Sequence, residues 1–391
     1  MISILPHHIL LLRRFREAIL FAPFLAYAYY LVAAVCARRF FSRSRPEQSE
    51  FTPPVSILKP VRGVDRQAYE NFTSFCRLDY PEYEILFGVA SPSDPAVAVI
   101  EKLIRDNPQL PIRLYTGMSQ RGPNEKASIL AHLACQARYD LFVVSDSDTR
   151  VAPGCLRSVA APFRDPGTGA VSCLYRGERD ATLADALEAV GVSSDFFPSV
   201  FVARQFGAAG FALGATMATT RPLLEEIGGF EGLADFLLDD NELGRRIAAH
   251  GYRVELLPFV VSMVLPAQTF AGYWQRQVRW SVGVRHAHPW GHLGLLVTQG
   301  LPLTIAALAV SHSFRDAAVY PAAYLATRYI MAWSVGVAGL KDSILRRKWW
   351  LAPLRDALAF GCWCASLRHN RVKWRGGAFT VRKGRLVPEG Q

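Results

Sequence analysis

The stretch DLFVVSDSDTRVAP, residues 140–153, contains an apolar run that ends abruptly in two aspartates one residue apart. The run predicts a buried strand over 140–146. Two interpretations of Asp146 and Asp148 are open at this point. Aspartate is common in the turns that follow strands. Two carboxylates this close together are also the ligands that a hard divalent cation prefers.

Strand and helix patterns alternate before this stretch. Strands are predicted over 55–61, 83–90, 111–117 and 140–146, and helices over 66–78, 94–107 and 124–138. The alternation with short links predicts an α/β fold with a mostly parallel sheet. Ligands of such sheets bind beyond the carboxyl ends of the strands. This rule places five polar residues at one edge, namely Asp94, Asn124, Lys126, Asp146 and Asp148.

The sequence lacks the usual glycine-rich loops that bind phosphate. No GxGxxG pattern follows the first predicted strand, and no Walker A motif occurs in the chain. A nucleotide diphosphate at this sheet would therefore have to be neutralised by other means. A cation held by Asp146 and Asp148, either Mg²⁺ or Mn²⁺, can bridge carboxylate and phosphate oxygens. Such an ion suits a sugar nucleotide, whose leaving diphosphate it would stabilise.

A second acidic site precedes a predicted helix that ends at Gly251. Asp239 and Asp240 lie just before its first turn. Carboxylates at this position interact favourably with the helix dipole, by ~0.3–1 kcal/mol. Two adjacent acids exceed what this requires, and one of them can act as general base towards an acceptor hydroxyl.

A third motif lies in GYWQRQVRWSVG, residues 272–283. Arg276, Arg279 and Trp280 have the i, i+3, i+4 spacing of one helix face. An amphipathic helix that leads into the membrane would show this spacing. Alternatively, the arginines contact a diphosphate, and the indole packs against the hydrophobic part of an acceptor.

Apolar segments at both ends of the chain predict membrane insertion. Residues 18–36 are uncharged and are flanked by arginines. About 19 residues cross a ~30 Å hydrocarbon core, whereas the apolar part of a signal peptide has only ~7–15 residues. We therefore expect an uncleaved anchor. The heavier basic flank follows it, which predicts a cytoplasmic location for the next domain.

Further apolar segments lie in the second half of the chain. Residues 293–310 and 317–340 are candidate spans, and Arg328 in the second would have to face protein or water. Residues 349–366 are expected to lie in the membrane interface or to re-enter. Residues 196–220 are predicted either to line an acceptor site or to form a buried strand with its approach helix.

The net charge of +11 lies largely beside the apolar segments. Anionic lipid head groups explain it better than nucleic acid, because the sequence has neither zinc-finger spacing nor an RNA-binding aromatic signature. The seven cysteines include no CxxC pair, which indicates reduced thiols in a cytosolic domain.

Six stretches in a fixed order resemble the ceramide glucosyltransferase family. They are ILKPVRGVD from residue 57, SPSDPA from 91, GPNEKAS from 122, VVSDSDTRV from 143, FLLDDNELGRRIAAHGY from 236 and RQVRW from 276. That family comprises inverting glycosyltransferases with a GT-A fold, including bacterial members that act on hopanoid lipids. The resemblance covers residues 52–290 and extends more loosely to both membrane regions and the tail.

The resemblance implies roles for the residues at the sheet edge. Asp94 would contact the uracil or ribose of a UDP-sugar, and Asn124 and Lys126 would line the nucleotide site. Asp146 would also take part in binding the nucleotide sugar and, with Asp148, would hold the metal. Some family members keep only the first of these two aspartates, so the presence of both favours metal dependence here.

The resemblance also assigns the later motifs. Asp240 would be the catalytic base with Asp239 as its neighbour, and the diphosphate and acceptor motif would consist of Arg276, Arg279 and Trp280. The family's third acidic site reads Glu-Asp where this chain has Asp-Asp. The division of labour between Asp239 and Asp240 is therefore open.

The expected organisation has five parts. These are a membrane anchor at 1–41, a linker at 42–54, a cytosolic GT-A domain at 55–290, transmembrane or interfacial segments at 291–367 and a basic tail at 368–391. The expected protein is an integral enzyme of the bacterial inner membrane. It would transfer one hexose from UDP-glucose or UDP-N-acetylglucosamine to a ceramide-like or hopanoid lipid, with inversion to a β-glycoside. The alternatives are a processive polysaccharide synthase and a non-catalytic membrane module that binds nucleotide sugars.

Overall fold

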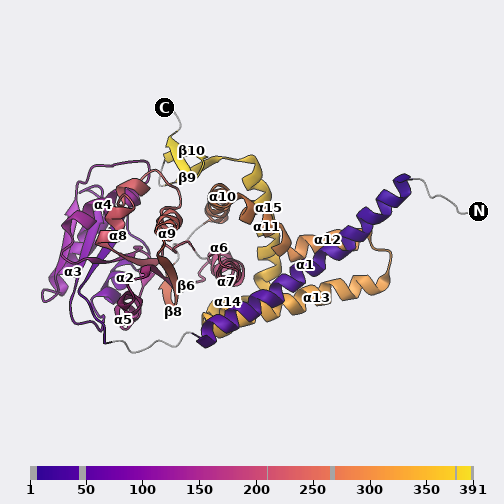
Figure 1. Cartoon of the computed structure of the whole chain (residues 1–391), viewed down its shortest axis with the longest axis horizontal. Coiled ribbons are helices and arrows are strands. Elements are labelled where there is room, and N and C mark those ends of the chain that lie inside the picture. The colour runs from indigo at the N-terminus through magenta and orange to yellow at the C-terminus, as the bar shows by residue number, and fades with distance from the viewer. Residues whose placement is uncertain (1–6, 44–49, 209, 265–268, 375–376, 389–391) are drawn as a thin grey trace, which may run out of the picture.

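An eight-stranded sheet forms the centre of an α/β domain, from which a group of helices extends (Figure 1). The computed structural model describes residues 7–43, 50–208, 210–264, 269–374 and 377–388. The strand order is β3-β2-β1-β4-β7-β6-β8-β5. The strands are β1 Val55–Val61, β2 Tyr83–Val89, β3 Ile112–Thr116, β4 Leu141–Ser145, β5 Thr149–Arg150, β6 Thr168–Gly177, β7 Thr216–Thr220 and β8 Arg253–Met263.

The first four strands form the predicted parallel part of the sheet. Strand β1 pairs in parallel with β2 and β4, and β2 pairs in parallel with β3. The crossover helices are α2 Ala68–Phe75, α3 Ala96–Asp106 and α4 Glu125–Gln136. Every residue of β1 is buried, because hydrophobic clusters cover both faces of the strand. The predicted α/β fold with a mostly parallel sheet is confirmed.

The second part of the sheet is mixed, which the sequence did not predict. Strand β7 is antiparallel to β4 and β6, β6 is parallel to β8, and β5 is antiparallel to β8. Residues 196–220 contain α7 Phe197–Gln205 and the buried strand β7, as one of the two interpretations expected. The other elements here are α5 Cys155–Ala160, η1 Ala161–Arg164, α6 Leu183–Gly191, η2 Val192–Phe196, α8 Arg221–Glu226, η3 Glu231–Leu233 and α9 Asp239–Ala249.

The predicted N-terminal apolar helix is present as α1 His7–Arg43. Its segment Leu11–Ser42 is long and apolar enough to cross a membrane. A second such segment, Leu183–Gln205, was not predicted as a span. The predicted span 293–310 is bent by 55° between Pro289–Thr298 and Gly300–Val310. Among the described residues, this makes two candidate spans, or three if the bent pair crosses the membrane as one.

The predicted span 317–340 differs from this group. It lies in α13 Phe314–Ala332 and the π-helical η5 Trp333–Gly339, which are not among the candidate spans found in the described residues. Its Arg328 is only 2% exposed and donates to Asp356, so it faces protein as expected. The remaining helices are α10 Phe270–Ala287, α11 Pro289–Gly294, η4 Leu295–Thr298, α12 Gly300–Val310, α14 Ser343–Lys348, η6 Trp349–Leu351 and α15 Ala352–Arg368.

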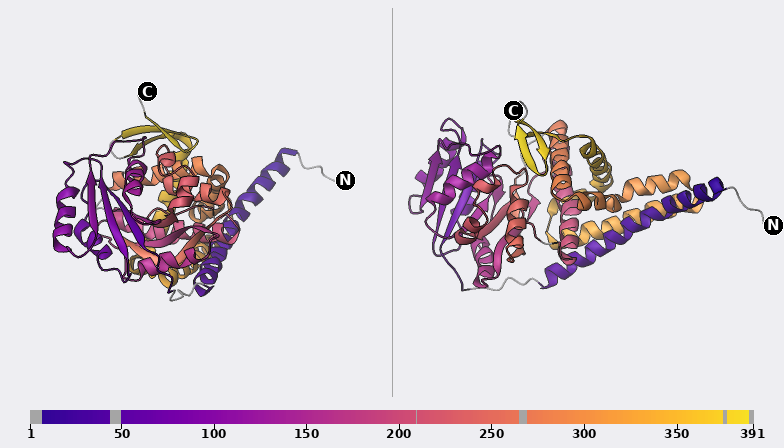
Figure 2. Two further views of the ribbon diagram at one scale, coloured as in Figure 1. Left: turned by 60° about the vertical axis from the view of Figure 1, so that its left-hand side comes forward. Right: turned by 45° about the horizontal axis from the view of Figure 1, so that its top comes forward.

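Helices α1, α12 and α13 lie side by side and point away from the sheet (Figure 2). Polar side chains join them. The hydroxyls of Tyr27 and Thr304 are 2.7 Å apart, and Tyr320 donates to the carbonyl of Leu20 at 2.9 Å. Interhelical hydrogen bonds of this kind are typical of helices that associate in lipid.

The basic tail contains a small sheet that the sequence did not indicate. Strands β9 Arg371–Trp374, β10 Gly377–Arg382 and β11 Arg385–Pro388 are antiparallel, in the order β11-β10-β9. This C-terminal sheet lies against α10 (Figure 1). It therefore belongs to the folded part of the molecule.

Candidate active site

The site is built around the loop that follows β4. The backbone N–H of Asp146 donates to the carbonyl of Ala215 at 3.2 Å, and the Lys59 ammonium donates to the carbonyl of Asp146 at 2.9 Å. These bonds fix the backbone where the strand ends. The Asp146 carboxylate remains one-third exposed and forms an ion pair of 2.6 Å with Lys126.

The start of α4 joins this loop to the second acidic site. Asn124 caps α4 by accepting from the N–H of Ala127 at 3.1 Å. Its side-chain amide also donates to Asp239, at 3.3 Å. Lys126 is buried, which opposes its charge, but the carboxylates of Asp146, Asp239 and Asp240 together raise its pKa. The carboxylates of both acidic sites thus act on the buried ammonium group of Lys126.

Asp148, the second aspartate of the first pair, is also partly buried. Burial, followed by the negative charges of Asp146 and Asp65, raises its pKa to about 7. Its buried Oδ1 has no hydrogen-bond partner among the residues that the structure describes. An orphaned carboxylate oxygen beside two other acids is an environment that an added cation would stabilise.

Asp239 and Asp240 occupy the first positions of α9. Burial and the neighbouring Asp239 raise the pKa of Asp240 to about 6, against the opposing charge of Lys126. Space beside Asp240 depends on Gly214, where a Cβ would lie 2.8 Å from Oδ2 of Asp240. A partly buried carboxylate with this raised pKa is a stronger base than ordinary aspartate and is still largely ionised at neutral pH.

The two arginines of the predicted motif in α10, Arg276 and Arg279, contact different elements. Arg276 forms an ion pair of 3.1 Å with the buried Glu188 of α6, and its charge lowers the pKa of Asp148. The Arg279 guanidinium lies over the ring of Trp374 at 5.9 Å, in the C-terminal sheet. Trp280 is partly buried. The charge of Arg276 therefore acts on Asp148 at the acidic edge, whereas Arg279 contacts the C-terminal sheet.

Asp94 lies at the predicted edge of the sheet, where its carboxylate accepts hydrogen bonds from backbone N–H groups. Its carboxylate accepts from the N–H of Gly63 and from the N–H of Ala96, both at 2.8 Å. It thus ties the loop after β1 to the start of α3. A cavity of about 90 Å³ lies near the ends of β2 and β3, lined by Ala90, Met118, Ser119, Gln120, Glu125, Ser128 and Ile129.

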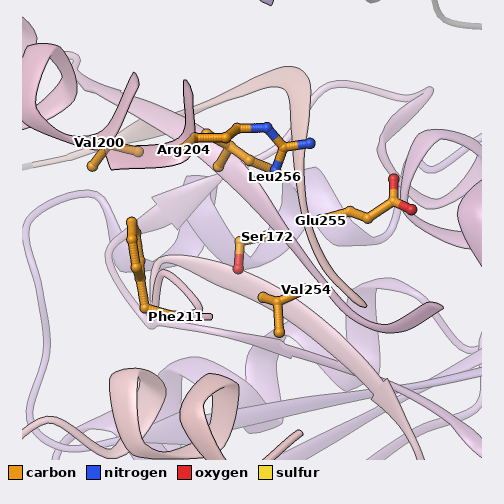
Figure 3. Close-up of a pocket in the computed structure, with 7 residues that line it drawn as sticks. All are labelled: Ser172, Val200, Arg204, Phe211, Val254, Glu255 and Leu256. Carbon is orange, nitrogen blue, oxygen red and sulfur yellow. The ribbon is translucent and has the colours of Figure 1, made fainter. Parts of the chain in front are cut away.

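A second cavity lies between α7, β6 and β8 (Figure 3). It is lined by Ser172, Val200, Arg204, Phe211, Val254, Glu255 and Leu256. Its volume is about 10 Å³, room for roughly one water molecule. Because it contains none of the predicted site residues, it is not the candidate active site.

Three residues at the site were not singled out from the sequence. Lys59 is fully buried, and burial lowers its pKa to about 7 while Asp146 and Asp148 act in the opposite direction. The phenol of Tyr175 has its pKa raised by burial and by the charges of Asp240 and Asp146. Asp65 accepts from the hydroxyl of Ser147. Only Lys59 could have been noticed in the sequence, because a lysine inside the apolar run of β1 is unusual.

Comparison with known proteins identifies the class of protein to which the chain belongs. The model of glycosyl transferase family 21 matches residues 18–387, and the chain belongs to this family. A similar solved structure is the mannosyltransferase PcManGT from Pyrobaculum calidifontis in complex with GDP-Man and Mn²⁺. It is 21% identical, with a TM-score of 0.55, and the match covers 90% of this chain and 99% of that one. This likeness supports the fold.

Curated relatives agree with the family. Ceramide glucosyltransferase 3 of Caenorhabditis elegans is 24% identical over 257 residues, which are 66% of this chain and 56% of the relative. Ceramide glucosyltransferase of Komagataella phaffii is 33% identical over 153 residues, or 36% of this chain and 30% of the relative. The match to the nematode protein thus spans about half of that relative's length. The predicted resemblance to this family is confirmed.

Proposed function

We propose that the chain is a membrane glycosyltransferase that transfers one hexose from a UDP-sugar to a hydroxyl of a membrane lipid, with inversion to a β-glycoside. UDP-glucose and UDP-N-acetylglucosamine are the proposed donors, and a ceramide-like sphingolipid or a hopanoid is the proposed acceptor. The observation that carries the proposal is the convergence of both acidic sites on the buried Lys126. Sugar transfer needs the residues that bind the donor diphosphate to lie next to the general base.

The proposed reaction is a single displacement. Asp240 accepts the proton of the lipid hydroxyl, and the hydroxyl oxygen forms a bond to the anomeric carbon. The bond from that carbon to UDP breaks, and UDP leaves with the electron pair. Lys126 and Arg276 lie where their charges act on the acidic edge, so they would oppose the negative charge of the diphosphate.

A divalent cation, Mg²⁺ or Mn²⁺, fits the first acidic site. Asp146 and Asp148 would hold it, and the orphaned Oδ1 of Asp148 supports this assignment. The described residues contain no group of three or more histidine, cysteine or acidic side chains placed to hold a metal. Mg²⁺ is commonly bound by one or two carboxylates together with substrate phosphates. When bound, the ion would neutralise charge on the leaving diphosphate.

The proposed location is the bacterial inner membrane, with the GT-A domain in the cytoplasm. The apolar segment Leu11–Ser42 supports membrane insertion. Arginines that follow its apolar core support the orientation. An acceptor embedded in the bilayer would then present its hydroxyl to the sheet edge.

The donor and acceptor can be identified from the product. Purified protein in lipid vesicles is supplied with one UDP-sugar at a time, and the lipids are analysed by mass spectrometry. We expect one added hexose per lipid. A polymer would instead indicate a polysaccharide synthase, and neither transfer nor hydrolysis of any donor would indicate a non-catalytic binding module.

Removal of divalent metal is expected to suppress transfer, and Mg²⁺ or Mn²⁺ should restore it. Asp148→Asn should weaken Mn²⁺ binding at least about tenfold, measured by titration of the ion in the presence of UDP. The matched control is Asp79→Asn, an exposed aspartate paired with Arg157. Equal Mn²⁺ affinity in both variants would remove Asp148 from the metal site.

A further inference from the structure

We infer that the C-terminal sheet positions the second acidic site, so that its strands act on catalysis through Asp239 and Asp240. The inference rests on the proposed function for the role of those aspartates. The sheet has three short strands, and a sheet this small is stable only if it buries a hydrophobic face. Its partner is the segment that leads into α9, together with α10.

The backbone of this lead-in segment, residues 235–238, pairs with the edge of the C-terminal sheet. The N–H of Leu237 donates to the carbonyl of Gly384 at 3.1 Å, and the N–H of Leu386 donates to the carbonyl of Asp235 at 2.7 Å. Phe236 and Arg385 form an antiparallel bridge between these bonds. The lead-in segment therefore extends the sheet beyond β11.

Side chains reinforce the backbone pairing. Leu237 shares a buried cluster with Val282 of α10 and with three residues of the tail, Val372, Val381 and Leu386. The Arg385 guanidinium also lies over the Phe236 ring at 5.1 Å. One hydrophobic cluster thus joins the acidic segment, the arginine-bearing helix and the tail.

The nucleotide side of the site holds the lead-in segment from the other direction. Asn124 donates through its side chain to the carbonyl of Phe236 at 2.8 Å. Its N–H donates to the carbonyl of Ala234, the residue directly before the segment, at 2.7 Å. Gly122 lies so close that a Cβ there would be 2.7 Å from the carbonyl oxygen of Ala234. The segment is therefore clamped between α4 and the C-terminal sheet.

This clamp determines where Asp239 and Asp240 begin α9. Only Leu238 separates the bonded Leu237 from Asp239, and Leu238 is the residue that a Cβ at Gly283 of α10 would contact. A displacement of the C-terminal sheet would therefore also displace the carboxylates of Asp239 and Asp240. Displacements near 1 Å can cost about 10²-fold in rate when geometry controls the reaction.

The turn between β10 and β11 offers a matched test. Lys383 and Gly384 have φ values of 48° and 79°, as in a two-residue hairpin turn that favours glycine. Gly384→Ala strains this turn, and its carbonyl is the one that holds Leu237. Gly207→Ala is the control, because Gly207 has φ +85° and a Cβ there meets nothing within 4 Å. Leu386→Ala tests the same clamp through packing.

We expect Gly384→Ala and Leu386→Ala to lower kcat about tenfold while KM for the UDP-sugar and UDP affinity change less than about twofold. Amide hydrogen exchange over 235–238 should become faster in both variants. Gly207→Ala should match the wild type in every measurement. Unchanged kcat and exchange in both variants would overturn the inference, as would loss of UDP binding in parallel with kcat.

The exchange measurement separates this inference from the proposed function. If the wild-type protein transfers no sugar to any lipid, the proposed function fails. Faster exchange over 235–238 in the two tail variants, with the control unaffected, would then still support the clamp. Unchanged exchange would refute it.

Discussion

Replacement of Asp240 by asparagine is expected to abolish sugar transfer and to leave UDP bound. The asparagine keeps the shape of the side chain but cannot accept the proton of the acceptor hydroxyl. Loss of a general base lowers a rate by about 10²–10⁴-fold. Turnover of labelled UDP-sugar measures kcat, and calorimetric titration with UDP measures donor affinity, which should stay within about threefold.

The adjacent Asp239 provides the comparison that assigns the base. Its carboxylate accepts from the Asn124 amide, and it is only 7% exposed, so it is tied to the nucleotide side of the site. We expect Asp239→Asn to reduce kcat about tenfold, because a bond that aligns α9 is weakened. A larger loss in Asp239→Asn than in Asp240→Asn would transfer the role of base to Asp239. Equal loss of UDP binding and turnover in Asp240→Asn would exclude that role for Asp240.

The acidic edge could be predicted because strand ends obey a simple geometric rule. Parallel strands in one sheet end on the same side, so Asp146 and Lys126 were placed together, and their ion pair of 2.6 Å agrees with that placement. The parallel strands were also recognisable as short apolar runs. A buried strand within residues 196–220 was one of two interpretations, but TMATT contains no such run, and the antiparallel place of β7 between β4 and β6 is visible only from its pairing.

Contacts between distant parts of the chain could not be predicted in this way. Glu188 lies in an apolar segment, and its role became visible only through its ion pair with Arg276. The C-terminal sheet escaped prediction because the tail has short strands, many charges and glycine, without clear alternation. Its strands are stabilised by the cluster around Leu237, which is tertiary context that no local pattern contains.

A buried ionic network joins the helices that extend from the sheet. Arg328 of α13 donates to Asp356 of α15 at 2.7 Å and to Asp195 of η2 at 2.7 Å. It also donates to the carbonyl of Ser194 at 2.7 Å. Tyr324 donates to the same Asp356 carboxylate at 2.7 Å. Arg328, which is itself buried, therefore neutralises the buried Asp356 and the partly buried Asp195, which belong to two different elements.

Replacement of Arg328 by methionine is expected to destabilise the protein severely. The change preserves much of the side-chain volume but leaves the buried Asp356 and the partly buried Asp195 without this partner. Removal of one partner of a buried ion pair costs about 3–5 kcal/mol. For a domain of this size the midpoint of thermal unfolding should fall by about 10 °C, measured in detergent by intrinsic fluorescence.

The matched control for this prediction is Arg315→Met, the same chemical change at an exposed position of the same helix. Substitutions at such positions usually change stability by less than about 0.5 kcal/mol, so its unfolding midpoint should match the wild type. If Arg328→Met and Arg315→Met unfold at the same temperature, the network does not hold the helices together. A selective loss in Arg328→Met would show that the ion pairs of Arg328 hold α13 to η2 and α15.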